Sequence, residues 1–179
     1  MDISIKIANK NELEEAILLS EKYCYKNTSD KNHGFTLKPI NQSYLGSVYV
    51  AKINENVIGT ACATDFSEED YKRYDAGSNF ECKEVGKVTV DENYREMGIG
   101  KKIIEFILKK FPNMDFYATI MEKPVENKSS KRLFESLGFK CYKIINRMVI
   151  KEYSPVVYNA FLIGINELCY FVFGNIAKS

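Results

Sequence analysis

The chain has 179 residues, of which 45% are hydrophobic and 27% are charged, and this composition suits one globular domain with a full core. Its net charge of +1, without a basic stripe or an acidic tail, argues against nucleic acid as the main partner. Five scattered cysteines and a single histidine argue against a metal site, and they favour a reducing, cytoplasmic setting with free thiols.

The polarity pattern predicts alternating strands and helices along most of the chain. In chain order we expect a strand at 3–8, a helix at 11–25, a hairpin of strands at 47–53 and 57–66, a strand at 83–90, a helix at 98–111, a strand at 115–121, a helix at 130–137 and one or two closing strands within 139–151. Asn11 and Glu14 resemble a capping box that would begin the first helix. This order predicts one mixed α/β domain of the α+β class over residues 1–152.

The C-terminal segment is predicted to be an added helix. Asn159 and Asn166 interrupt an apolar run at 156–173, and their spacing of seven places them on one helical face. We therefore expect residues 153–179 to form an amphipathic helix that packs on its own domain or on a second subunit in a homodimer. Membrane association is the less favoured alternative, because polar residues interrupt the run.

A glycine segment precedes the helix at 98–111 and indicates an anion site. Ile103 stands where a dinucleotide-binding motif needs its third glycine, and Arg95 stands where a P-loop needs its first. Unpaired backbone N–H groups and the helix dipole nevertheless favour an anion at such a helix start. Lys101 and Lys102 add positive charge, although a plain turn with surface lysines is the alternative.

Two motifs together resemble the GNAT acetyltransferase superfamily. The pattern Arg95-x-x-Gly98-x-Gly100, after a strand ending at Val90, resembles the acyl-CoA pyrophosphate loop of that family. The pattern that runs from Asn127 through Phe134 to Gly138-Phe139 is similar to its Asn-x6-Tyr-x3-Gly-Phe signature. The resemblance is specific over about 84–140, fits the element order over 3–151, and does not extend to the C-terminal segment. It implies a central, mostly antiparallel sheet, flanked by helices, in which acyl-CoA enters the gap of a splayed strand pair.

The resemblance also implies roles for individual residues in cofactor binding. The backbone of Val88 and Val90 would pair with the thioester carbonyl and the pantetheine arm, and an N–H aimed at the oxyanion makes Val88 part of the catalytic set. The remaining loop contacts to the pyrophosphate would come from Arg95, Met97, Gly98, Ile99, Gly100 and Lys101. Asn127 would hold the CoA arm or a strand carbonyl, with helix capping as the alternative.

Phe134 departs from the family pattern, because relatives often have a tyrosine there that protonates the departing thiolate. We expect Phe134 to pack against the cofactor, and the general acid is unassigned, with Tyr117 and Tyr142 as candidate substitutes. A thiol with a pKa of about 8.5 leaves tolerably as thiolate without an acid.

Glu84 is the candidate general base. It lies six residues before Val90, where many relatives have a base glutamate, and strand parity would place it on the same face as Val88 and Val90. Four residues of strand put it about 13 Å from Val88, which favours proton transfer through water. The alternative is a solvated charge on the strand.

The sequence therefore predicts an acetyltransferase that moves an acetyl or other short acyl group from acetyl-CoA to a primary amine by direct attack. The alternative is a non-catalytic acyl-CoA-binding or regulatory module, which Phe134 makes worth testing. Loop composition does not distinguish a small-molecule amine from a peptide amine as the acceptor.

Overall fold

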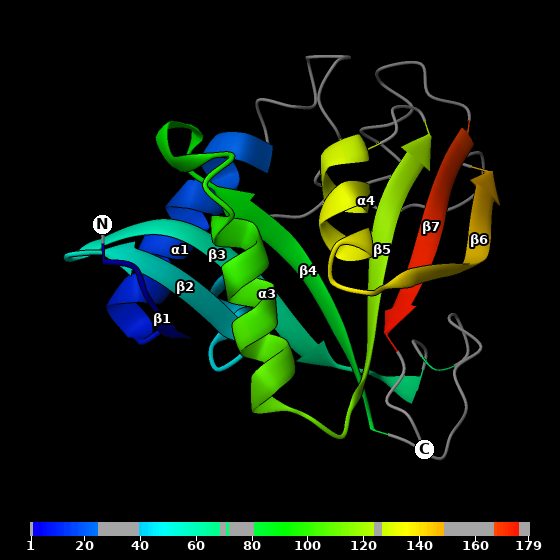
Figure 1. Ribbon diagram of the computed structural model, residues 1–179, viewed down its shortest axis with the longest axis horizontal. Coiled ribbons are helices and arrows are strands. Elements are labelled where there is room, and N and C mark those ends of the chain that lie inside the picture. Colours follow the sequence, from blue (N-terminus) through cyan, green and yellow to red (C-terminus); the bar gives the residue numbers. More distant parts are fainter. Residues whose placement is uncertain are drawn as a thin grey trace.

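A single β-sheet forms the centre of the structure, a computed structural model that describes residues 2–24, 40–68, 71, 81–123, 127–148 and 167–175 (Figure 1). Among these residues, seven strands pair in the order β1-β2-β3-β4-β5-β7-β6. The strands are β1 Ser4–Ile7, β2 Val48–Ile53, β3 Asn56–Asp65, β4 Cys82–Val90, β5 Asp115–Lys123, β6 Lys140–Met148 and β7 Glu167–Asn175. The helices are α1 Lys10–Cys24, α3 Ile99–Lys110 and α4 Lys128–Glu135, with short 3₁₀ turns at Gln42–Tyr44 and Glu92–Tyr94.

The elements predicted up to residue 148 are confirmed, with shifts of a few residues at their ends. The hairpin of β2 and β3 closes tightly, since Ile53 pairs with Asn56 and Asn54 takes a positive φ of 53°. The capping box of α1 was misplaced. Asn9 and Glu12 form it, through reciprocal hydrogen bonds of 3.0 Å from each backbone N–H to the other's side chain.

The predicted C-terminal helix is wrong over Glu167–Asn175, which form β7 (Figure 1). This strand pairs antiparallel with both β5 and β6. A continuous apolar run looks alike in a buried helix and in an interior strand, but Tyr, Phe and Val favour the strand, which gains hydrogen bonds on both sides. These residues therefore do not form the helix that was expected to pack on the domain or on a second subunit. The rest of the predicted helix lies outside the described residues. In the described parts, none of the helices is both long and apolar enough to cross a membrane.

The predicted splayed strand pair is confirmed at β4 and β5. These parallel strands are in register only from Cys82 opposite Asp115 to Glu84 opposite Tyr117. Beyond that point β4 continues beside β3, whereas β5 continues beside β7. Figure 1 shows β4 and β5 diverging from a shared end. Two halves of the sheet thus meet at one short stretch of pairing.

The core is divided between the two faces of the sheet, with α3 and α4 on one face and α1 on the other (Figure 1). Tyr49 and Ala51 of β2 pack with the isoleucines of α3, and Val48 and Val50 pack with α1. This alternation follows from the two-residue period of a strand, and it shows that both faces of β2 are buried.

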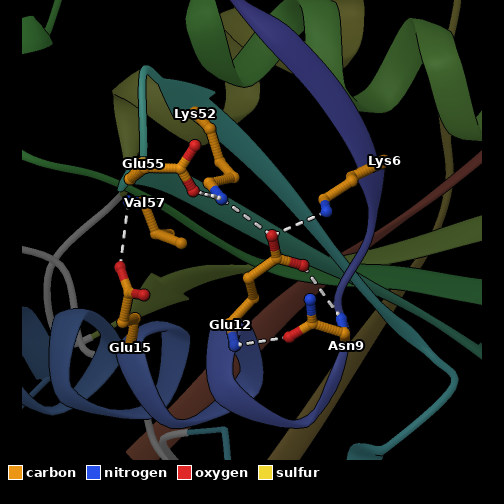
Figure 2. Close-up of polar contacts among 7 residues, drawn as sticks. All are labelled: Lys6, Asn9, Glu12, Glu15, Lys52, Glu55 and Val57. Atoms are coloured by element: carbon orange, nitrogen blue, oxygen red, sulfur yellow. Dashed lines mark hydrogen bonds and ion pairs between the residues drawn. The ribbon is translucent and has the colours of Figure 1, made fainter.

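A buried charge cluster joins α1 to the edge of the sheet (Figure 2). Glu12 is 3% exposed, and one carboxylate oxygen lies 2.7 Å from the Lys6 ammonium and 2.9 Å from the Lys52 ammonium. Burial alone raises the pKa of Glu12, but hydrogen bonds from the Asn9 backbone and the two lysines outweigh it and lower the pKa to about 2. This carboxylate is therefore fully satisfied by its own chain.

Candidate active site

The turn from β4 into α3 ends in an open helix start. Gly98 is the N-cap residue, has a left-handed φ of 72° and lacks a side chain that could cap the helix. The Lys102 N–H makes the first α-helical bond, to the Gly98 carbonyl at 3.0 Å. The N–H groups of Ile99, Gly100 and Lys101 thus precede the helical ladder and have no acceptor within it. This is the geometry that the glycine motif predicted for an anion.

Gly100 brings the two sequence motifs together. A Cβ at this position would lie 3.2 Å from Val88 Cγ1, 3.7 Å from Val90 Cγ2 and 3.6 Å from Leu133 Cδ2. The missing side chain therefore lets the start of α3 approach both β4 and α4 closely. Residues around 88–101 and 127–139, which are far apart in the sequence, form one contiguous region.

Arg95 lies beside this region but is held by its own chain. Its Nε donates a hydrogen bond of 3.2 Å to the Val90 carbonyl, and its guanidinium lies 4.5 Å from the centre of the Tyr23 ring. Arg95 and Met97 are both exposed, and Lys101 is half-buried. The loop thus has the cations Arg95 and Lys101 on either side of the open helix start in the sequence.

A bulge in β4 changes the face on which Glu84 lies. Gly86 is opposite Cys62 and Thr89 is opposite Thr60, so Ala61 faces both Lys87 and Val88. Lys87 has a positive φ of 53° at this point. A bulge reverses the alternation of side chains along a strand. The prediction that Glu84 shares a face with Val88 and Val90 is therefore wrong.

The register places Glu84 on the α1 side of the sheet. Its neighbour Val85 packs on the α3 side together with Val88 and Val90. Glu84 accepts a hydrogen bond of 2.9 Å from the Thr119 hydroxyl, across the point where β4 and β5 part. The candidate base thus lies at the narrow end of the splay.

Two residues that sequence reasoning missed lie near Glu84. The Lys87 ammonium lies 5.2 Å from the centre of the Tyr44 ring. Burial raises the pKa of the Tyr44 hydroxyl, and the neighbouring Cys62 and Glu84 raise it further. Burial also raises the pKa of Cys62 to about 12, so this thiol is protonated at neutral pH and is no nucleophile. The contact between Lys87 and Tyr44 forms only in the folded chain, because the two residues are far apart in the sequence, and no local pattern predicts it.

The second motif provides a capped helix and a core residue. The Asn127 side chain accepts a hydrogen bond of 3.0 Å from the Ser130 N–H and thus caps α4. Phe134 is 3% exposed and packs edge-on against Phe139, with ring centres 5.0 Å apart. Contacts of Asn127 and Phe134 with a cofactor stay predictions.

Of the two tyrosines considered as general acids, the structure describes the side chain of Tyr117. Tyr117 is buried on β5, with its ring centre 5.2 Å from that of Phe66, and the Tyr142 side chain lies outside the described set. Among the described residues, no group of His, Cys, Asp and Glu side chains could hold a metal ion.

Comparisons with known proteins agree on one family. The model of the acetyltransferase (GNAT) family matches residues 15–139. N-alpha-acetyltransferase 30 of Saccharomyces cerevisiae is 31% identical over 68 residues, which are 38% of this chain and 39% of the yeast protein. The chain therefore matches well under half the length of this relative.

Solved structures resemble the chain over nearly all of its length. Arabidopsis thaliana NAA60 in complex with a bisubstrate analogue has a TM-score of 0.68 at 14% identity, and the likeness covers 99% of this chain and 100% of that one. YncA of Salmonella typhimurium, solved with its cofactor acetyl-CoA, has a TM-score of 0.62 at 18% identity. The likeness covers 99% of this chain and 95% of YncA. At these identities the likeness establishes the shared fold.

Proposed function

The chain belongs to the GNAT acetyltransferase family, and from this premise we propose that it transfers an acetyl group from acetyl-CoA to a primary amine by direct attack. The observation that carries the proposal is the open start of α3 beside the splayed end of β4. An anionic cofactor at the helix start and an extended arm along the strand would use both features.

The cofactor would be held mainly by backbone groups. The N–H groups of Met97, Ile99, Gly100 and Lys101 would bind the pyrophosphate, because they precede the hydrogen-bond ladder of α3. Beyond Glu84, β4 has left the register of β5, so the backbone of Val88 and Val90 would pair with the pantetheine arm. An N–H of this strand would then stabilise the oxyanion that forms on the thioester.

The chemistry balances without a metal. The amine lone pair attacks the thioester carbonyl, the resulting tetrahedral species loses the C–S bond, and the thiolate leaves. The amine proton passes to a base, which gives an N-acetyl amide and, after protonation, CoA-SH. The side chain of Phe134 has no proton to donate, so in this proposal the sulfur departs as thiolate and takes its proton from water.

Glu84 is proposed as the base, acting through water. Its carboxylate lies on the α1 side of β4, opposite the side chains that pack under α3, and Thr119 orients one of its oxygens. An acceptor that enters from the α1 side would reach the same strand from the face opposite the α3 core. Tyr44 and Lys87 would line that approach.

We favour a peptide α-amine as the acceptor, because the yeast relative is an N-alpha-acetyltransferase. To test this, the full chain is incubated with acetyl-CoA and one of three acceptor classes. These are peptides with a free N-terminus, peptides that contain lysine but have a blocked N-terminus, and small amines. We expect release of CoA-SH with the first class, with the acetyl mass on the peptide N-terminus. Binding of acetyl-CoA without CoA-SH release from any acceptor would favour the non-catalytic module.

The Glu84→Gln variant tests the base. We expect kcat to fall by about a hundredfold, the lower end of the range for general bases, and mostly at low pH where little amine is free. The exposed Glu81, which lies just before β4 and three residues from Glu84, offers a control carboxylate, and Glu81→Gln should retain the wild-type profile. Identical pH–rate profiles for Glu84→Gln and wild type would remove Glu84 as a base.

A further inference from the structure

Tyr23, in the last turn of α1, contacts the β4–α3 turn at several points and has no part in the proposed chemistry. Its hydroxyl accepts a hydrogen bond of 2.9 Å from the Glu92 N–H, and it lies 3.4 Å from a carboxylate oxygen of Asp91. Its ring lies beneath the Arg95 guanidinium at 4.5 Å. Tyr23 is 8% exposed, so one nearly buried side chain holds both ends of the 91–95 turn.

Tyr23 adds an external support to a turn that is mostly exposed. None of the residues in its 3₁₀ segment, Glu92–Tyr94, is buried. Glu96 and Gly98 follow with positive φ values of 65° and 72°, the first of them an unfavourable geometry for a residue with a side chain. Hydrogen bonds to Asp91 from the Asn93 and Tyr94 N–H groups close the turn locally, and the Asp91 N–H donates to the Ile58 carbonyl, whereas the Glu92 N–H donates to Tyr23.

Neighbouring contacts strengthen this attachment to α1. The Lys22 ammonium lies 3.4 Å from Asp91 and 3.5 Å from Glu92. Lys22 and Glu92 are both well exposed, so these ion pairs are weak. The less exposed contacts, through the Tyr23 hydroxyl and ring, therefore contribute more to this attachment to α1 than the ion pairs do.

We propose that Tyr23 is a positioning residue for cofactor binding: it holds the 91–95 turn so that Arg95 and the N–H groups at the start of α3 face the pyrophosphate of acetyl-CoA. This inference rests on the proposed function. Tyr23 itself contacts neither the thioester nor the acceptor. Its removal should weaken only the part of the binding energy that the pyrophosphate half of the cofactor contributes.

The experiment compares CoA, which has the pyrophosphate, with pantetheine, which lacks it. Equilibrium affinities of both are measured for wild type, Tyr23→Phe and Tyr23→Leu. We expect Tyr23→Phe, which keeps the ring under Arg95 but removes the hydrogen bonds to Glu92 and Asp91, to weaken CoA binding at least about fivefold, the loss that one hydrogen bond would cause. Tyr23→Leu should weaken it further, and pantetheine affinity should be unchanged in both variants.

A matched control is available at the other end of β4. The Tyr71 hydroxyl accepts a hydrogen bond of 3.3 Å from the Cys82 N–H, so Tyr71→Phe removes the same kind of contact away from the turn. The ratio of CoA affinity to pantetheine affinity in Tyr71→Phe should equal that of wild type. In steady state, Tyr23→Phe should raise the KM for acetyl-CoA with little change in kcat.

The outcomes separate the two proposals. If wild type binds CoA no more tightly than pantetheine, the proposed function fails at its cofactor site. If wild type prefers CoA and Tyr23→Phe and Tyr23→Leu keep the same preference, the positioning role alone is overturned. Equal weakening of CoA and pantetheine in the Tyr23 variants would also overturn it, because general loss of structure affects both ligands.

Discussion

The starts of α1 and α3 differ in how their backbone N–H groups are satisfied. At α1, Asn9 and Glu12 cap each other's N–H groups, and two lysines neutralise the Glu12 carboxylate (Figure 2). At α3, the N-cap is Gly98, which provides no side-chain acceptor. The first helix start is completed within the chain, and the second is left open to a ligand.

The difference shows why helix starts with similar dipoles have different uses. Each helix has positive partial charge at its N-terminus, which a carboxylate or a phosphate can neutralise. Glu12 fills this role at α1 and contributes to stability. At α3 the same role would fall to the pyrophosphate of the cofactor, which leaves the free protein with an unsatisfied helix start.

The largest expected effect comes from giving α3 a carboxylate of its own. Gly98→Glu would place a negative charge about 4 Å from the proposed phosphate position, a repulsion of about 4 kcal/mol that corresponds to roughly a thousandfold loss in acetyl-CoA affinity. Isothermal titration calorimetry measures it. Unchanged affinity would contradict the cofactor site at α3.

Alanine controls separate charge from backbone strain. Gly98 and Gly138 have positive φ values of 72° and 84°, and a Cβ at either position would meet no atom within 4 Å. Gly98→Ala and Gly138→Ala should thus each destabilise the fold by about 1 kcal/mol. Acetyl-CoA affinity should remain near wild type in Gly138→Ala and change far less in Gly98→Ala than in Gly98→Glu.

The reverse change at α1 should affect stability and leave cofactor binding intact. Glu12→Gln removes the charge that offsets Lys6 and the buried Lys52, so we expect a loss of about 3 kcal/mol in the free energy of unfolding. Urea denaturation gives this value. A large drop in acetyl-CoA affinity in the folded variant would show that the two helix starts are not independent.

Acid should lower the stability of the fold through Glu12 at the start of α1. The pKa of Glu12 falls from 4.5 to about 2 on folding, so the unfolded chain binds the proton more readily. Its contribution to stability is complete above about pH 4.5 and is lost as the pH falls toward 2. Denaturation measured across this range should show a smaller acid loss in Glu12→Gln than in wild type. If the free energy of unfolding fell equally with pH in Glu12→Gln and in wild type, the role of Glu12 would be contradicted.

The smallest effect is expected at α4, whose start is also capped within the chain. Asn127→Ala removes the acceptor for the Ser130 N–H and should lower stability by about 1 kcal/mol. If capping is its only role, the KM for acetyl-CoA will stay constant. A several-fold rise in KM would instead favour the contact with the CoA arm that the family resemblance implies.

Local patterns made the proposed cofactor site predictable. The glycines at 98 and 100 and the start of α4 at Asn127 are read from adjacent residues, and the structure brings these motifs together. Long-range features escaped prediction. The apolar run of β7 becomes a strand because β5 and β6 both pair with it, which no local pattern reports.

The side of β4 proposed for the acceptor was less predictable, because a one-residue bulge changes which side chains lie there. The bulge at Lys87 and Val88 moves Glu84 to the other face, and simple alternation cannot show a bulge. The support that Tyr23 gives to the turn is also invisible in the sequence, since 68 residues separate it from Asp91. Both features depend on tertiary contacts.

The most direct test follows individual backbone N–H groups by NMR as CoA is added to the full chain. We predict large amide shifts for Ile99, Gly100 and Lys101, which should not occur with pantetheine. The amides of Asn9 and Glu12, already hydrogen-bonded within α1, should not move. Saturation with CoA that leaves the three amides of α3 unshifted would contradict the assignment of this helix start to the pyrophosphate.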